Sequence, residues 1–192
     1  MEWLKELRDG LDAEFGTRPR VVTLATVDLT GWPHARMVVC RRIDDDGTIY
    51  VVSDARSQKN MQVRARPAAE FCFWLPTLRT QFRVSGDIVP VAAHVPETAI
   101  DLESETTRVR REAWEKLSPT ARALFAWPMP GEARVDDDAA FVKSNDATSA
   151  PDNFEVLLTA PRAVERLDLN THPHRRRRWM LETEWVGVDL NP

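Results

Sequence analysis

The sequence is poor in cysteine and contains no long apolar run. Only Cys40 and Cys72 are present, each within an apolar stretch typical of a strand. Two thiols that are not arranged as Cys-x-x-Cys cannot form a four-ligand zinc site unless histidines help, so we predict two buried, reduced thiols. No apolar stretch approaches the roughly 20 residues that a membrane-spanning helix needs. The N-terminal MEWLKELRDG is charged and amphipathic and does not resemble a signal peptide. We therefore expect a cytoplasmic protein without membrane contact.

The sequence also lacks an excess of positive charge and the glycine-rich phosphate loops. Its net charge is −4 and its pI about 5.6, whereas a general nucleic-acid binder needs a basic face. The arginine run at 175–178 would alternate across a strand, so we interpret it as a solvated ribbon with one arginine turned inward. Neither GxGxxG nor GxxxxGKS/T occurs, so dinucleotide and triphosphate sites are not predicted. His172 and His174 share a strand face, but two ligands without a nearby carboxylate do not predict a metal site.

Hydrophobic periodicity predicts a mainly β protein with peripheral helices. A chain of 192 residues suits a single domain, here 1–192. Residues 128–150 are rich in Pro, Gly, Asp and Ser and predict a long loop. The predicted helices lie at 2–15, 57–66, 95–117 and 118–127, and the predicted strands at 20–28, 34–43, 48–53, 69–75, 80–92, 154–160, 162–169, 174–182 and 184–190.

Several predicted strands are apolar on both faces. Met37 and Val39 point one way, and Val38 and Cys40 point the other. A sheet with one solvated face would alternate between apolar and polar residues. The pattern therefore favours a small closed barrel that also packs against a second layer, either the helices or another subunit.

Cationic and hydroxyl side chains are concentrated between Arg36 and Lys59. The segment reads RMVVCRR, then a turn of three aspartates and a glycine, then TIYVVSDARSQK. The hairpin brings the two strands and the following helix start together. A phosphate ester with nearly two negative charges prefers two cations, together with hydroxyl and backbone donors at a helix start. Arg36, Ser53, Ser57 and Lys59 are therefore candidate ligands of such a group.

Three segments, RMVVCRR, VSDARSQK and TQFRVSG, resemble in order and spacing the pyridoxamine 5′-phosphate oxidase superfamily of FMN-binding split barrels. The resemblance extends over nearly the whole chain. WPMPG at 127–131 and HRRRRW at 174–179 look closest to the oxidase-related subfamily, whose members are mostly named for FMN binding. The resemblance implies a mostly antiparallel split β-barrel, bound FMN, a homodimer with two flavins at its interface, and a small-molecule substrate.

The resemblance also implies roles for individual residues. The strand from Arg36 to Arg41 would run along the flavin, and Ser53, Ser57 and Lys59 would serve the phosphate end. Gln81 would reach the cofactor from the partner subunit, and Arg176 would close the site from the C-terminal hairpin. The implied cofactor-binding residues are Arg36, Met37, Val38, Val39, Arg41, Ser53, Ser57, Lys59, Gln81 and Arg176.

The chain departs from the oxidase pattern at the phosphate end of the cofactor. The oxidase has Ser-Arg-Lys where this chain has Ser57-Gln58-Lys59, so one phosphate cation is missing. Arg56 is a candidate replacement. A family tryptophan near the flavin falls on Leu167.

The oxidase's clamp for the phosphate of its substrate is also altered. Its tyrosine, arginine and serine fall on Trp114, Ser118 and Arg122, and its Arg-x-His retains only His174. Trp114, Arg122 and His174 are therefore candidate substrate-binding residues. Loss of the tyrosine and arginine should cost a phosphorylated substrate several kcal/mol. Vitamin B6 phosphate oxidation is thus disfavoured unless Arg122 and Arg41 rebuild the clamp.

The leading hypothesis is an FMN-dependent oxidoreductase with an unspecified small substrate. The redox chemistry belongs to the cofactor, so no catalytic side chain is assigned. One alternative is a flavin- or haem-binding carrier or sensor without turnover, because split barrels host such ligands. The other is an authentic pyridoxamine 5′-phosphate oxidase.

Overall fold

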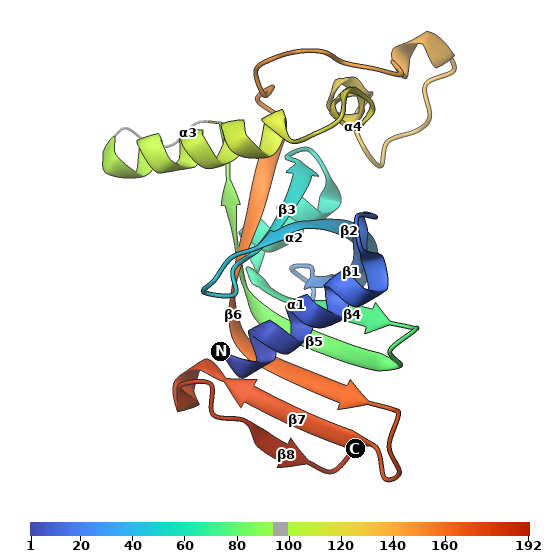
Figure 1. Cartoon of the computed structure of the whole chain (residues 1–192). Helices are drawn as coiled ribbons and strands as arrows, with labels where there is room; N and C mark the ends of the chain where they lie inside the picture. The colour runs from blue at the N-terminus through green and yellow to red at the C-terminus, as the bar shows by residue number, and fades with distance from the viewer. Residues whose placement is uncertain (94–99) are drawn as a thin grey trace.

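The strands of the described chain form one antiparallel sheet that closes on itself. The computed structural model describes residues 1–93 and 100–192, and the predicted helical residues 95–99 lie outside this part. The eight-stranded sheet has the order β3-β2-β1-β4-β5-β6-β7-β8, and pairing of β3 with β6 closes the first six strands into a barrel (Figure 1). The strands are β1 (Arg20–Val27), β2 (Pro33–Ile43), β3 (Ile49–Asp54), β4 (Ala68–Leu75), β5 (Thr80–Val91), β6 (Phe154–Asp168), β7 (Arg175–Met180) and β8 (Val188–Leu190).

The helices pack around this barrel. α1 (Glu2–Phe15) buries Trp3, Leu7 and Leu11 completely in the main core, as its predicted apolar spacing requires. α3 (Ile100–Glu115) lies across the upper end of the molecule, and the β7–β8 ribbon forms the lower end (Figure 1). The remaining helical segments are α2 (Gln58–Ala65), α4 (Pro119–Ala123), η1 (Leu124–Ala126), η2 (Asp138–Ala140) and η3 (Leu181–Thr183).

Two separately predicted strands, 154–160 and 162–169, are one continuous strand, β6. Pro161 was expected to end a strand, but it lies opposite Gly86 where the β5–β6 register shifts. A bulge can accommodate a proline that donates no hydrogen bond. A Cβ at Gly86 would lie 2.2 Å from the carbonyl oxygen of Ala160, so this close crossing requires glycine. The β5–β6 ladder therefore has a bulge or irregularity at Gly86.

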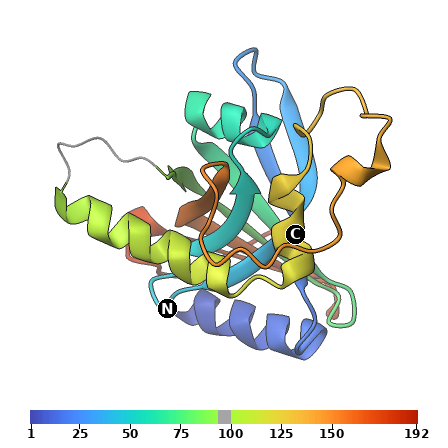
Figure 2. The same cartoon turned by 90° about the horizontal axis from the view of Figure 1, so that it is seen from above.

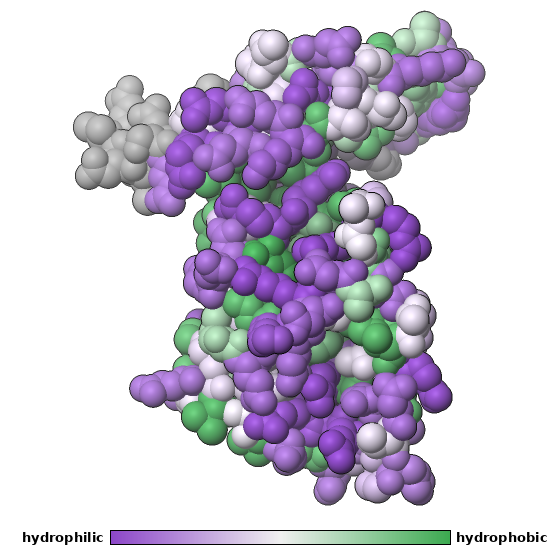
Figure 3. Space-filling view, in the orientation of Figure 1, coloured by the Kyte–Doolittle hydropathy of each residue, from purple (hydrophilic) through white to green (hydrophobic). Residues whose placement is uncertain are grey.

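A second apolar cluster joins α3 to the barrel. Trp114 is fully buried and makes edge-to-face contacts with Phe125 and Phe154. The long segment at 128–150 was predicted as a loop, and apart from η2 it is one. Figure 2 shows this segment running beside α3 and α4. On the face seen in Figure 3, the α3 layer is mostly hydrophilic, and hydrophobic residues show where it meets the barrel. Within the described residues, no helix is long and apolar enough to cross a bilayer.

The two cysteines differ more than predicted. Cys40 is 3% exposed, and burial raises the pKa of its thiol to about 12. Cys72 is only half-buried on the outer surface of β4, so the expectation of two buried thiols holds for Cys40 alone. Because the thiolate is the nucleophile, we expect Cys40 to be protected from iodoacetamide at pH 8 in the native protein and to be alkylated once the protein is denatured. Peptide mass spectrometry would locate the adduct, and labelling of Cys40 in the native protein would contradict its burial.

Candidate functional site

The start of α2 faces a small group of polar side chains from β1, β2 and β3. Ser57 is the N-cap residue of α2, but its hydroxyl makes no capping hydrogen bond. Ser53, at the end of β3, and Ser57 are both buried, and their hydroxyl oxygens are 3.4 Å apart. The helix therefore presents unpaired backbone N–H groups beside two hydroxyls, an arrangement that suits an anion. We call Arg36, Ser53, Ser57 and Lys59 the cradle.

Arg36 enters the cradle from β2. Its guanidinium donates to the Oγ1 of Thr26 at 2.7 Å, to the carbonyl of Leu24 at 3.2 Å and to the Oε1 of Gln62 at 2.8 Å. All three acceptors are neutral, so the side chain is held in place while its charge remains uncompensated. Partial burial lowers the pKa of Arg36, which is the effect of removing a cation from water without giving it a counter-ion.

Lys59 enters the cradle from the first turn of α2. Its Nζ donates to the Oγ of Ser57 at 3.1 Å. Burial, followed by repulsion from Arg36, lowers the pKa of Lys59, and the more distant Asp54 only partly opposes this shift. In the part of the chain that the structure describes, neither cation forms an ion pair. Two converging, partly buried positive charges are unfavourable unless an anion joins them. A phosphate monoester, with nearly two negative charges, matches this charge.

Arg56 does not replace the missing phosphate cation. Its guanidinium binds both carboxylate oxygens of Asp54, at 3.0 and 2.7 Å, and donates to the carbonyl of Trp127 at 3.1 Å. Asp54 is further held by Asn153. Arg56 is thus neutralised and ties the start of α2 to the segment after α4, so the cradle keeps two uncompensated cations.

The other predicted residues of β2 divide between the two sides of the strand. Val38 is 9% exposed and belongs to the core, whereas Met37 is 62% exposed on the outer surface. Thr23 pairs with Met37 across the β1–β2 ladder, and its hydroxyl approaches the Met37 sulfur at 3.3 Å. Val39, two residues along, shares the Met37 side. This strand can therefore offer backbone and apolar surface to a flat ring.

Gln81 and Arg176 lie far from the cradle along the sheet. Gln81 pairs with Leu167, which pairs with Arg176, whereas the cradle begins at β2, on the other side of β1 and β4. The Nε and Nη2 of Arg176 donate to the Oε2 of Glu165 at 3.0 and 2.6 Å. Burial alone would raise the pKa of Glu165, but the bonds from Arg176 and Arg83 lower it. The fold thus presents Gln81 and an oriented Arg176 on the outer surface of the sheet.

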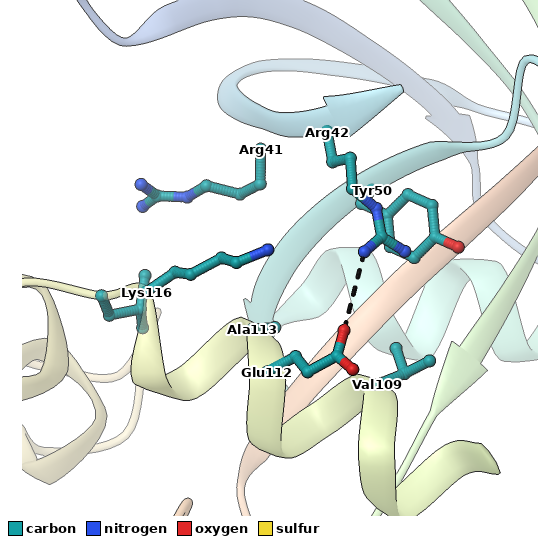
Figure 4. Close-up of a pocket in the computed structure, with 8 residues that line it drawn as sticks. Arg41, Arg42, Tyr50, Val109, Glu112, Ala113 and Lys116 are labelled. Carbon is teal, nitrogen blue, oxygen red and sulfur yellow. Dashed lines mark ion pairs between the residues drawn. The ribbon is translucent and has the colours of Figure 1, made fainter. Parts of the chain in front are cut away.

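A cavity of about 300 Å³ lies between α3 and the β2–β3 hairpin (Figure 4). On one side, the guanidinium of Arg42 lies 3.8 Å from the ring centroid of Tyr50 and forms an ion pair with Glu112 at 3.8 Å. On the other side, Arg41 from β2 and Lys116 from the end of α3 extend along the cavity (Figure 4). Neither of these two cations has an ion pair within the described residues. Apolar side chains complete the lining: Val109, Ala113 and Leu117.

Comparison with known proteins gives the same fold and cofactor. The family model described as pyridoxamine 5′-phosphate oxidase, FMN-binding domain, matches residues 1–92. The crystal structure of a pyridoxamine 5′-phosphate oxidase-related, FMN-binding protein from Nostoc punctiforme is similar over 100% of this chain and 98% of that chain, with a TM-score of 0.89 and 30% identity. The chain belongs to the pyridoxamine 5′-phosphate oxidase-related family of FMN-binding split barrels. Its predicted fold and its predicted cofactor, FMN, are thereby confirmed.

Two relatives named for a specific reaction match a smaller part of this chain. A pyridoxine/pyridoxamine 5′-phosphate oxidase of Thermosynechococcus vestitus is 32% identical over 120 residues, which are 62% of this chain and 55% of that protein. The Arabidopsis thaliana pyridoxine/pyridoxamine 5′-phosphate oxidase 2 is 29% identical over 153 residues, 79% of this chain and 74% of that protein. The chain therefore spans little more than half the length of the first of these oxidases.

Two of the candidate clamp residues, Trp114 and Arg122, contact the backbone around the end of α3. Trp114 is fully buried, and its Nε1 donates to the carbonyl of Ala147 at 2.9 Å. Arg122 donates to the carbonyls of Trp114, Glu115 and Ala147 and lies over the Trp114 ring. Both side chains contact backbone carbonyls around the end of α3, and neither lines the α3 cavity that Arg41 lines. Their role in substrate binding stays a prediction.

His174 lies apart from the α3 cavity. It is exposed beside β7, and its Nδ1 is 2.9 Å from the carbonyl of Thr171. It immediately precedes β7, which lies beyond the closed barrel, and it does not line the α3 cavity.

The sequence analysis missed the polar residues behind the cradle. On α2, Asn60 and Gln62 are buried, whereas Met61 is 55% exposed. Glu155, on β6, is 2% exposed. One signal was available: the segment SQKNMQV has too few apolar residues for an ordinary amphipathic helix.

Proposed function

We propose that this single-domain protein is an FMN-dependent oxidoreductase that works as a homodimer on a small anionic molecule. The observation that carries the proposal is the pair of uncompensated cations, Arg36 and Lys59, at the start of α2 in a family of FMN-binding barrels. The phosphate of FMN supplies the anion that this pair lacks. Bound FMN would supply the hydride-transfer chemistry.

The protein's own residues would bind and orient. Arg36, Lys59 and the hydroxyl groups of the cradle would hold the phosphate, each charge-assisted hydrogen bond contributing about 1.5–3 kcal/mol. The outward side of β2, at Met37 and Val39, would lie along the ring and exclude water from it. This assignment keeps the backbone of β2 available for the polar edge of the ring.

The homodimer would bury an exposed apolar surface and complete the site. Val21, Met37 and Trp74 are 41%, 62% and 45% exposed on the outer side of β1, β2 and β4, and exposed apolar patches commonly mark protein interfaces. The same side of the sheet carries Gln81 and the oriented Arg176. A second copy of the chain packed on this surface would bring those two residues toward the flavin.

The α3 cavity would receive the substrate. Arg41 and Lys116 supply two cations that have no ion pair among the described residues, and Val109, Ala113 and Leu117 supply apolar surface. A flat molecule with one carboxylate or phosphate group fits this combination. The same two cations support an authentic pyridoxamine 5′-phosphate oxidase as the second candidate.

The proposal is tested on purified full-length protein. We expect a yellow protein that releases FMN, identified by mass, at one molecule per chain, and a solution mass near twice 21.9 kDa. Anaerobic bleaching of the flavin absorbance by small anionic substrates would identify the electron donor, and peroxide release with pyridoxamine 5′-phosphate would favour the second candidate. A colourless protein that does not bind added FMN would refute the proposal, and bound haem would favour the carrier alternative.

A further inference from the structure

A buried carboxylate lies directly behind the cradle. Glu155 is 2% exposed and pairs with Ser53 across the β3–β6 ladder. One carboxylate oxygen accepts a hydrogen bond from the Nδ2 of Asn60, and the other accepts one from the Nη2 of Arg64. Asn60 and Arg64 lie one turn apart on α2. Glu155 therefore joins β6 to the helix whose first turn carries Lys59.

The charge of Glu155 is not explained by stability alone. Transfer of a carboxylate to the interior is costly even when it is paired. Arg64 is 44% exposed, so water can solvate its guanidinium without help from Glu155. The group that depends on Glu155 is Asn60, which is completely buried. A carboxylate accepts hydrogen bonds only, so it fixes which end of the Asn60 amide faces it.

The orientation of Asn60 determines how the two serines are used. With its NH₂ group turned to Glu155, Asn60 presents Oδ1 to the cradle. The hydroxyl of Ser53 donates to this oxygen at 2.5 Å, whereas the hydroxyl of Ser57 donates to it at the longer distance of 3.4 Å. Ser57 also accepts a hydrogen bond from Lys59. The Ser53 proton is therefore committed to Asn60, while Ser57 can exchange its longer hydrogen bond for one to a ligand.

We propose that Glu155 and Asn60 are positioning residues for the phosphate of FMN, which fix Ser53 as an internal support and leave Ser57 as the hydroxyl that donates to the phosphate. The inference rests on the phosphate site proposed above. It adds a connection from β6 through Asn60 to the cradle, and it divides the roles of two serines that look equivalent in the sequence.

Glu155→Gln tests the connection at nearly constant volume. A glutamine offers one acceptor and one donor, so either Arg64 or Asn60 faces a donor, and a flipped Asn60 would present NH₂ to Ser53. We expect the Kd for FMN, measured by flavin fluorescence on flavin-free protein, to rise about 10-fold. The Kd for riboflavin, which lacks the phosphate, should change less than about 2-fold. If Glu155 had a role in folding alone, its substitution would weaken the binding of FMN and of riboflavin equally.

Two controls separate failure of this inference from failure of the phosphate site. Glu6 lies on α1, and its carboxylate accepts a hydrogen bond from Arg166 at 2.6 Å. Glu6→Gln removes the charge of this carboxylate and should leave both Kd values unchanged. Arg36→Ala should abolish the preference for FMN over riboflavin. If Arg36→Ala keeps that preference, the phosphate site is wrong. If Arg36→Ala loses it while folded Glu155→Gln keeps it, only the role of Glu155 is wrong.

The serines provide a test that does not require a stable Glu155 variant. Ser57→Ala should reduce the preference for FMN over riboflavin about 10-fold, because it removes the available donor. Ser53→Ala should reduce it less than about 3-fold, because that hydroxyl already donates to Asn60. Equal losses in the two variants, or a greater loss in Ser53→Ala, would overturn the proposed division of roles.

Discussion

The double variant Arg36→Ala/Lys59→Ala is expected to fold and to purify without flavin. Each side chain would give the phosphate a charge-assisted hydrogen bond of about 1.5–3 kcal/mol, so losing both should weaken FMN binding by about 100-fold to 10,000-fold. The fold should survive, because two partly buried cations that lack ion pairs within the described residues repel each other in the flavin-free protein. Removing both cations relieves this repulsion, and the gain offsets the loss of the hydrogen bonds from Arg36 to Thr26 and Gln62.

The measurement is flavin absorbance per chain after purification, with circular dichroism to confirm folding. Arg66→Ala is a suitable control, because Arg66 follows α2, is exposed, and its guanidinium donates to the carbonyl of Leu29. It removes a positive charge near α2 without touching the cradle, so full flavin content is expected. A folded double variant that retains one FMN per chain would show that the phosphate binds elsewhere.

The barrel could be predicted because short-range sequence patterns indicate its strands and turns. Alternating apolar positions and the Asp-Gly turn at Gly47 are short-range signals, and they give strands and hairpins close to those of the structure. Pro161 misled the prediction because a proline normally ends a strand, and only the register opposite Gly86 reveals that β6 continues. That register depends on chain pairing between residues about 75 positions apart, which local patterns do not contain.

The cradle could be predicted in part for the same reason. Arg36, Ser57 and Lys59 are joined by one hairpin and one helix start, so their proximity follows from short-range connections. Glu155 is more than 90 positions from Asn60, and its position behind the cradle follows only from the pairing of β3 with β6. Lys116 likewise reaches the cavity beside Arg41 because α3 crosses the barrel end, an arrangement that helical periodicity alone does not determine.

Trp114 shows why a residue type does not reveal its role. A tryptophan in a helix of this family looked suitable for a flat ligand, but α3 turns it inward onto Phe125 and Phe154. The carbonyl of Ala147 then satisfies its indole N–H, as a buried donor requires. The same residue ties α3, β6 and the 128–150 segment together. Its contribution should therefore be to stability first.

Trp114→Ala is expected to be the most destabilising single substitution among those considered. Removal of a fully buried tryptophan leaves a cavity and costs about 3–5 kcal/mol of unfolding free energy, which corresponds to a fall in Tm of about 6–20 °C for a chain of this size. Chemical denaturation at fixed flavin concentration measures the loss. Trp32→Ala is the matched control, because Trp32 is 69% exposed on the β1–β2 hairpin and should change stability by less than about 1 kcal/mol.

Trp114→Phe separates packing from ligand binding. It keeps an aromatic ring against Phe125 and Phe154 but removes the indole N–H, so the Ala147 carbonyl loses its donor and stability should fall by about 1–2 kcal/mol. FMN content should remain complete, and the KM of any substrate that bleaches the flavin should stay within about 2-fold, because the side chain is sealed from the α3 cavity. A variant with wild-type stability and a strongly raised KM would place Trp114 against the substrate instead of in the core.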